Sequence, residues 1–213
     1  MVGKVCLSKR LKKRSFWGNP YGSSQHERHA VNPAKGLVFT KVWKREDPRD
    51  VLILRTAKHL SELREDAVIA TGSKRRAFQL LKLRPDLQII NIRGNVDTRL
   101  RKMEEQQLDG IVLAAAGLKR LGMEDVITQY LAPEDMISAP AQGALALEVR
   151  EDQKELQKML DVFCDEETMN EVCAERNFLE QMGGSCHTPA GARCQKTDQG
   201  YELYTMFGNE EWK

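Results

Sequence analysis

Three short apolar runs, each followed at once by a short corner and a helical pattern, constrain the fold of this chain most. They cover residues 67–70, 87–92 and 110–115. Strand, corner and helix therefore recur with short connections, which is typical of an α/β sheet with parallel strands. We predict a doubly wound α/β fold in which ligands bind at the carboxyl ends of the strands.

The first corner places two arginines at the start of a helix. A turn at 71–73 ends in Ser73, which is a candidate N-cap for a helix over Lys74–Leu83. Arg75 and Arg76 then lie in the first helical turn, beside the positive end of the helix dipole.

The second corner repeats this arrangement. A turn at 93–95 precedes a helix with Asp97 as its candidate cap and Arg99 inside it. Cations are favoured at helix C-termini, so arginines at two helix starts oppose the dipoles unless an anion lies between them. The two corners therefore predict an anion site. The alternative is that these arginines, Arg101 included, are solvated surface side chains.

Further strands and two amphipathic helices are predicted elsewhere in the chain. The second helix is expected to end at a C-cap formed by Gly183 and Gly184. The strands are expected at 37–43, 51–54, 143–149 and 201–207, and the helices at 152–163 and 166–182.

Five cysteines occur without a CxxC pair, and their odd number disfavours a closed disulfide framework. We therefore expect a reducing, cytoplasmic environment. Cys186 stands on a glycine-rich loop, where a cysteine is exposed enough to react, or else it is a small buried apolar side chain. Cys164 and Cys173 lie in helical patterns, which favours the buried state for them. The group Cys186, His187 and Cys194 matches no common zinc spacing, so no metal is expected.

The formal charge is +2 overall but uneven along the chain. Residues 1–35 hold eight Lys and Arg against one acid, Glu27, so they carry +7 and the remainder carries −5. Residues 1–32 show no sustained period, and we expect poor order there. The basic run at 9–14 is a weak signal for nucleic acid. No apolar run reaches the roughly 18 residues of a membrane span, and no secretory signal is recognisable.

Five motifs in order along the chain carry a family resemblance. They are REDPRDVL at 45–52, IRGNVDTRL at 92–100, AAGLKRLG at 115–122, QGAL at 142–145 and GGSCHTP at 183–189. From residue 36 onward the chain resembles porphobilinogen deaminase, also called hydroxymethylbilane synthase. This family of transferases joins four porphobilinogen units head to tail into hydroxymethylbilane, with release of ammonia, in tetrapyrrole (heme) biosynthesis. The resemblance implies porphobilinogen as the partner and a monomer, with neither membrane nor nucleic acid involved.

The same resemblance assigns roles to particular residues. Members of the family carry a dipyrromethane cofactor on a loop cysteine through a thioether, and Cys186 matches that position. Each pyrrole bears an acetate and a propionate, and guanidinium groups bind carboxylates in a bidentate manner. The residues that match the family's cofactor and substrate contacts are Ser73, Arg75, Arg76, Arg93, Arg99 and Arg120.

Three domains are implied, of which the first two are periplasmic-binding-protein-like and the third is a small α+β domain. Domain two is expected at 48–138, and domain three, shortened, at 165–213. A remnant of domain one is expected at 36–47 and 139–164, and residues 1–35 are expected to be an unrelated segment.

The catalytic residue is the main departure from the family pattern. The family places its catalytic aspartate in a His-Ser-Met-Lys-Asp segment before the strand at 37–42. Residues 25–30 of this chain, QHERHA, contain no aspartate, and Glu27 is not assigned the role. We therefore hold the catalytic residue unknown and expect impaired activity.

Residues 22–30 offer one explanation for this departure. Codons allowed for these residues, when they are shifted by one base, encode Ala-Val-His-Ser-Met-Lys-Asp-Met-Pro, so the segment is interpreted as a frameshift product. Two other functions stay open. One is a non-catalytic remnant that binds carboxylate-rich tetrapyrroles, and the other is a nucleic-acid binder that uses residues 9–14.

Overall fold

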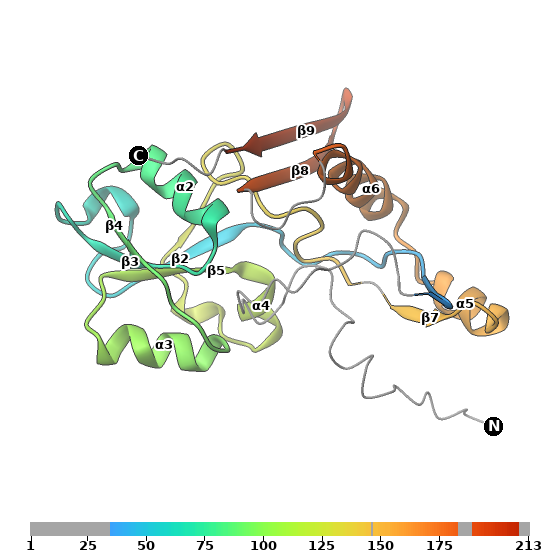
Figure 1. The fold of residues 1–213 in the computed structure, drawn as a ribbon, viewed down its shortest axis with the longest axis horizontal. Coiled ribbons are helices and arrows are strands. Elements are labelled where there is room, and N and C mark those ends of the chain that lie inside the picture. Colours follow the sequence, from blue (N-terminus) through green and yellow to red (C-terminus); the bar gives the residue numbers. More distant parts are fainter. Residues whose placement is uncertain (1–34, 146, 183–188, 209–213) are drawn as a thin grey trace.

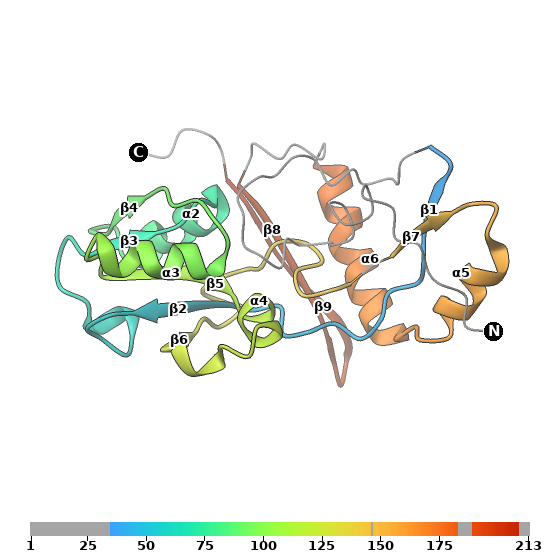
Figure 2. The ribbon, with the colours of Figure 1, turned by 90° about the horizontal axis from the view of Figure 1, so that it is seen from below.

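The computed structural model describes residues 35–145, 147–182 and 189–208 of the chain. In these residues a five-stranded sheet, called the central sheet because it is the largest, lies at one end of the long axis. A two-stranded sheet lies at the other end (Figure 1). Two extended segments connect the two ends. The first, at 44–49, leads into β2, and the second, at 131–145, follows β6. A third sheet, a hairpin, lies across the middle (Figure 2).

The central sheet is mixed rather than parallel. Parallel pairing joins β3 to β4 and to β5, whereas β2 runs antiparallel to both β5 and β6. The strand order is β4 (Gln88–Ile90), β3 (Val68–Ala70), β5 (Gly110–Ala114), β2 (Asp50–Leu54) and β6 (Gln129–Tyr130).

The prediction of a parallel sheet was therefore wrong for β2. This strand enters the sheet from the extended segment at 44–49, with no crossover helix before it. A parallel neighbour requires a long crossover connection, and β2 has none that would fix its direction. The sequence pattern revealed that residues 51–54 form a buried strand, but not which way the strand runs.

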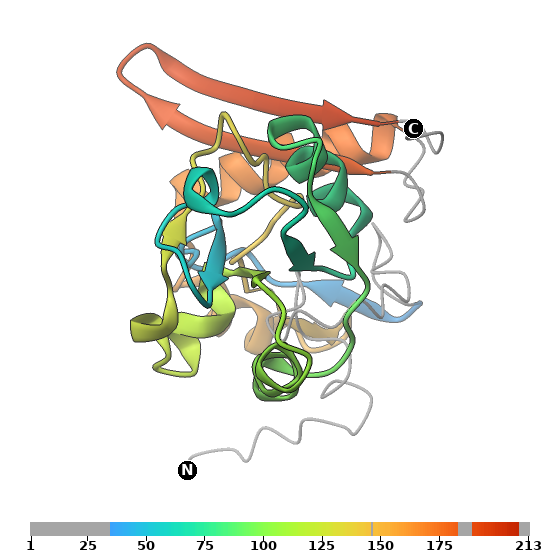
Figure 3. The same cartoon turned by 90° about the vertical axis from the view of Figure 1, so that its left-hand side faces the viewer.

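Helices cover both faces of the central sheet. Alternate residues of β2 point to opposite faces, so Val51 packs with α3 (Val96–Glu105) and α4 (Ala115–Arg120), while Leu52 packs with α2 (Lys74–Leu83). Figure 3, which faces this end of the molecule, shows α3 on one side and the hairpin on the opposite side. The predicted α/β class is confirmed.

The two arginine-bearing corners start their helices with different caps. Helix α2 has the predicted bounds, and the Ser73 hydroxyl accepts the backbone N–H of Arg76 at 3.4 Å. Asp97 is not the cap of α3, because Asn95 accepts the N–H of Thr98 at 2.8 Å. Asn is strongly preferred at an N-cap, and the preceding glycine, at φ +134°, turns the chain for it.

The two-stranded sheet is smaller than the sequence predicts. Strand β1 (Leu37–Phe39) pairs antiparallel with β7 (Glu148–Arg150), and α5 (Lys154–Asp161) follows. The predicted strand at 143–149 is shortened because Gly143, at φ +82°, turns tightly against the backbone of Glu46. A Cβ at this glycine would lie 2.4 Å from the Glu46 carbonyl oxygen, so only glycine fits where the two extended segments pass each other.

The C-terminal unit consists of α6 (Glu166–Gln181) packed on the hairpin of β8 (Ala190–Thr197) and β9 (Gly200–Phe207). This is the predicted α+β unit, although strand β8 was not predicted. The predicted C-cap at 183–184 lies outside the described residues. None of the helices that the structure describes combines the length and apolar character needed to cross a bilayer.

One buried carboxylate attaches this unit to both extended segments. Glu175 is fully buried on α6 and accepts hydrogen bonds from Arg45 at 2.9 Å and from the backbone N–H groups of Ala141 and Cys194 at 2.6 and 2.9 Å. Burial raises the pKa of Glu175, although the charge of Arg45 opposes that shift.

Candidate anion-binding site

The carboxyl edge of the central sheet gathers the arginines of the first corner around an aspartate. Because β2 runs antiparallel to β5, its first residue, Asp50, pairs with the last residue of β5, Ala114. Asp50 therefore lies at the edge where β3 ends and α2 begins. Arg75 and Arg76, in the first turn of α2, are both buried beside it.

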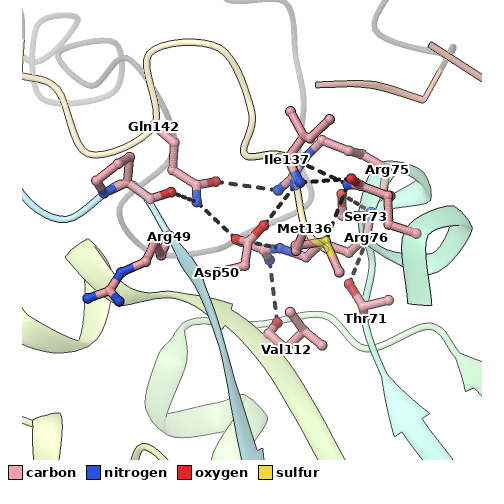
Figure 4. A network of polar contacts seen from close by, with 12 residues as sticks. Arg49, Asp50, Thr71, Ser73, Arg75, Arg76, Val112, Met136, Ile137 and Gln142 are labelled. Carbon is pink, nitrogen blue, oxygen red and sulfur yellow. Dashed lines mark hydrogen bonds and ion pairs between the residues drawn. The ribbon is translucent and has the colours of Figure 1, made fainter. Parts of the chain in front are cut away.

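Asp50 forms a buried ion-pair cluster with both arginines (Figure 4). Its Oδ1 accepts Nη2 and Nε of Arg76 at 2.7 and 3.0 Å, and Oδ2 lies 2.7 Å from Nη1 of Arg75. The Arg75 contact is a charge pair without hydrogen-bond alignment. Burial alone would raise the pKa of Asp50, but the two guanidinium charges outweigh it and lower the pKa to about 2.

Gln142 completes this cluster from the second extended segment. Its Nε2 donates to Oδ1 of Asp50 at 2.9 Å and to the carbonyl oxygen of Pro48 at 2.6 Å. Arg75 also donates to the carbonyl oxygen of Ile137 at 2.5 Å. The protein itself therefore uses much of the donor capacity of the arginine pair.

Arg99 has a different environment. Only 1% of this residue is exposed, and its Nε donates to the Gly94 carbonyl oxygen at 2.8 Å. Its Nη2 is buried and has no hydrogen-bond partner among the described residues. Burial, with a contribution from the charge of Arg76, lowers the pKa of Arg99 to about 10. Arg99 is therefore a buried cation close to the arginine pair, and one of its donors has no partner among the described residues.

The other predicted residues lie at or outside the edges of this cluster. Ser73 is half-buried and acts as the N-cap of α2, whereas Arg93 and Arg120 are exposed. Lys119 pairs with Glu46 at 2.9 Å. Cys186 and Glu27 lie outside the described residues.

The predictions for the other cysteines were partly wrong. Cys173 is exposed on α6, and Cys164 is half-buried at a bridge to Trp43 rather than inside a helix. A helical pattern does not show which face of the helix a residue occupies when the hydrophobic period is weak. Cys194 is buried, and burial raises its pKa.

Sequence reasoning missed Asp50 and Gln142, although both lie in motifs that it singled out. The available signal for Asp50 was an acid directly before a buried apolar run. A charge at such a position is buried with the strand and requires a partner.

A carboxylate-rich ligand fits the donor set. Arg75, Arg76 and Arg99 are permanently charged, and the open Nη2 of Arg99 is a buried donor that lacks an acceptor among the described residues. Guanidinium groups bind carboxylates through charge-assisted hydrogen bonds. The fold and this site together define an α/β protein with three buried arginines near the carboxyl edge of its central sheet.

The comparisons with known proteins specify the family. Residues 30–158 match the family model described as "Porphobilinogen deaminase, dipyromethane cofactor binding domain". The chain belongs to the porphobilinogen deaminase family, and its matched domain is the one that binds the family's dipyrromethane cofactor.

Two curated relatives show how much of the family's length this chain represents. The chain is 54% identical over 181 residues to porphobilinogen deaminase of Lachnospira eligens, a match that covers 84% of this chain and 61% of the relative. It is 50% identical over 167 residues to that of Bacillus subtilis, covering 78% of this chain and 53% of the relative. The chain thus spans between half and two thirds of the length of these relatives.

The comparison with solved structures finds binding proteins at low TM-scores and low sequence identity. A nutrient binding protein from Burkholderia cenocepacia bound to methionine has a TM-score of 0.44 and 14% identity, over 81% of this chain and 76% of that one. A periplasmic binding protein from Salmonella typhimurium with high arginine specificity has a TM-score of 0.37 and 13% identity, over 70% and 64%.

Proposed function

We propose that this chain holds the carboxylates of a growing pyrrole chain and forms the arginine-bearing part of a porphobilinogen deaminase-type transferase. The reaction is the head-to-tail condensation of four porphobilinogen units into hydroxymethylbilane, with release of ammonia, in the cytoplasm. A monomer is sufficient for binding, because all three buried arginines come from one chain. The observation that carries the proposal is the unpaired donor Nη2 of the buried Arg99, which has no partner among the described residues.

The physical support is the cost of leaving such a group unpaired. A buried polar group without a partner costs about 1–3 kcal/mol, and more when it is charged. A ligand carboxylate next to Arg99 removes this cost, and water-poor surroundings strengthen the attraction. Porphobilinogen and its oligomers carry two carboxylates on every ring, so each added unit brings further partners for the arginines.

Four groups would hold the dipyrromethane cofactor. In this proposal Cys186 is the point of thioether attachment, and Arg75, Arg76 and Arg99 hold the carboxylates, with Ser73 keeping the arginine pair in place as the cap of α2. When bound, the cofactor supplies the pyrrole carbon to which new units are joined. Arg93 and Arg120, which are exposed, are assigned to carboxylates at the rim of the site.

Turnover by this chain is proposed to be slow. The carboxylate beside the buried arginines is Asp50, whose pKa of about 2 and two guanidinium partners make it a poor proton acceptor. Loss of a positioned general acid or base removes about 10²–10⁴-fold in rate. A non-catalytic binder of carboxylate-rich tetrapyrroles is therefore the second candidate, and the same open donor on Arg99 favours it.

Incubation of the purified chain with porphobilinogen and with hydroxymethylbilane tests the proposal. Intact-mass spectrometry should detect a covalent dipyrromethane adduct, and product formation should be slow. Cys186→Ser should abolish the adduct, whereas Cys173→Ser should leave it unchanged, because Cys173 is an exposed thiol on α6. An adduct that persists in Cys186→Ser contradicts the assigned cysteine. If the unaltered chain forms no adduct, the non-catalytic binder remains as the candidate function. Turnover at a rate typical of enzymes would contradict the expected impairment.

A further inference from the structure

We propose that Asp50 is a positioning residue, an internal counter-ion that fixes Arg75 and Arg76, while Arg99 has no counter-ion among the described residues. This inference rests on the proposed function only in taking a carboxylate as the ligand.

The need for a counter-ion follows from where the arginine pair lies. Arg75 and Arg76 are neighbours in the first turn of α2, at the positive end of its dipole, and both are buried. Two buried like charges at this position repel each other and the dipole. Asp50, which is also fully buried, contacts both guanidinium groups through different oxygens, each at 2.7 Å. One carboxylate therefore contacts both guanidinium groups and compensates one of their two charges in the absence of any ligand.

Contacts from two parts of the fold fix the orientation of Asp50. The arginines approach from α2, and Gln142 approaches from the second extended segment, as Figure 4 shows. Because Gln142 also donates to the Pro48 carbonyl oxygen, it connects Asp50 to the backbone just before β2. This amide adds no charge, so its contribution is to orientation.

The balance of charge gives the surplus positive charge that is available to a ligand. Three guanidinium groups against the one carboxylate of Asp50 leave two positive charges uncompensated. A single pyrrole unit carries two carboxylates, which matches this surplus. The open donor lies on Arg99, and the pair next to Asp50 is held ready by contacts within the protein.

Chemical rescue by formate tests this role directly. Asp50→Ala removes the counter-ion and leaves room for a small carboxylate between the two guanidinium groups. We expect its melting temperature to fall by about 10 °C, because breaking a buried ion pair strands the remaining charges. Formate should restore part of that loss in a saturable manner, whereas neutral formamide, and chloride at equal ionic strength, should not.

Asp47→Ala is the matched control. Asp47 lies three residues earlier and pairs with Arg49 at 2.6 Å. The Arg49 side chain is more exposed than those of Arg75 and Arg76. This variant should lose little stability and should show no rescue by formate. Gln142→Met keeps the charge of Asp50 and removes its orienting amide, so we expect a loss of a few degrees and a severalfold weaker affinity for porphobilinogen.

Three results would overturn the inference. They are an Asp50→Ala variant as stable as the unaltered chain, equal rescue by formate and formamide, or an Asp50→Ala variant that stays unfolded in formate. The formate titration involves neither porphobilinogen nor turnover. A failure of the proposed function therefore appears in the adduct experiment, and a failure of this inference appears in the rescue experiment.

Discussion

The central sheet and the β1–β7 sheet differ in how completely they are packed. Every residue of β2 and β5 is buried between helices on two faces. No residue of α5 is buried, and three apolar side chains in and after this helix are exposed, namely Met159 at 68%, Val162 at 79% and Phe163 at 63%. Within the part of the chain that the structure describes, the central sheet thus has two large clusters of buried apolar side chains, and α5 contributes no buried residue.

Because of this difference, the proposed carboxylate binding depends on one part of the chain and the remainder of the family's activity on others. Arg75, Arg76, Arg99 and Asp50 all belong to the well-packed unit, so the anion site does not depend on the β1–β7 sheet for its buried contacts. The chain also spans only 61% and 53% of two relatives' lengths. The proposed carboxylate binding can therefore be tested on this chain separately from catalysis.

The largest expected effect is a loss of stability from a cavity in the well-packed unit. Leu52→Ala removes a fully buried side chain of β2, and we expect a loss of about 2–5 kcal/mol in the free energy of unfolding. Met159→Ala, a truncation on α5, should cost less than about 0.5 kcal/mol, since surface substitutions rarely cost more. Urea unfolding measures both. Equal losses would show that the two units are packed alike.

Acid should lower the free energy of unfolding of the well-packed unit, because Asp50 becomes protonated. This effect should be somewhat smaller than that of the cavity. The pKa of Asp50 is lower in the folded chain, about 2, than its ordinary value of 3.8. Its contribution to stability is therefore complete above about pH 4 and is lost as the pH falls to 2. The size is about 2 kcal/mol. Urea unfolding at pH 5, 4 and 3 should give a steeper loss for the unaltered chain than for Asp50→Ala. Parallel curves would contradict this assignment.

Local sequence signals predicted the well-packed unit closely. Helix α2 has its predicted bounds, and Ser73 is its cap, because a turn, a capping residue and a helical period all agreed there. The arginine corners also predicted that an anion lies between them. In the structure the carboxylate of Asp50, which was not predicted from the sequence, contacts both arginines of the first corner, and an anion between the two corners stays a prediction.

Features that depend on contacts distant in sequence could not be predicted. Gln142 reaches Asp50 across 92 residues, and no local pattern connects them. The direction of β2 and the close approach of Gly143 to Glu46 also depend on how the extended segments cross. Strand β8 was missed because residues 190–197 lack a clear alternation and form a strand by pairing with β9.

The most direct test of the account is the affinity of porphobilinogen for this chain, measured by titration calorimetry with Arg99→Gln. A charge-assisted contact contributes about 1.5–3 kcal/mol, so we expect the substitution to weaken binding by at least about tenfold. Its melting temperature should stay the same or rise, since an unpaired buried cation costs stability. Arg101→Gln is the control, because Arg101 is exposed and pairs with Glu105 at 3.5 Å. Saturable binding that Arg99→Gln weakens and Arg101→Gln does not is the predicted result; equal affinity for all three chains, or no binding at all, would contradict the account.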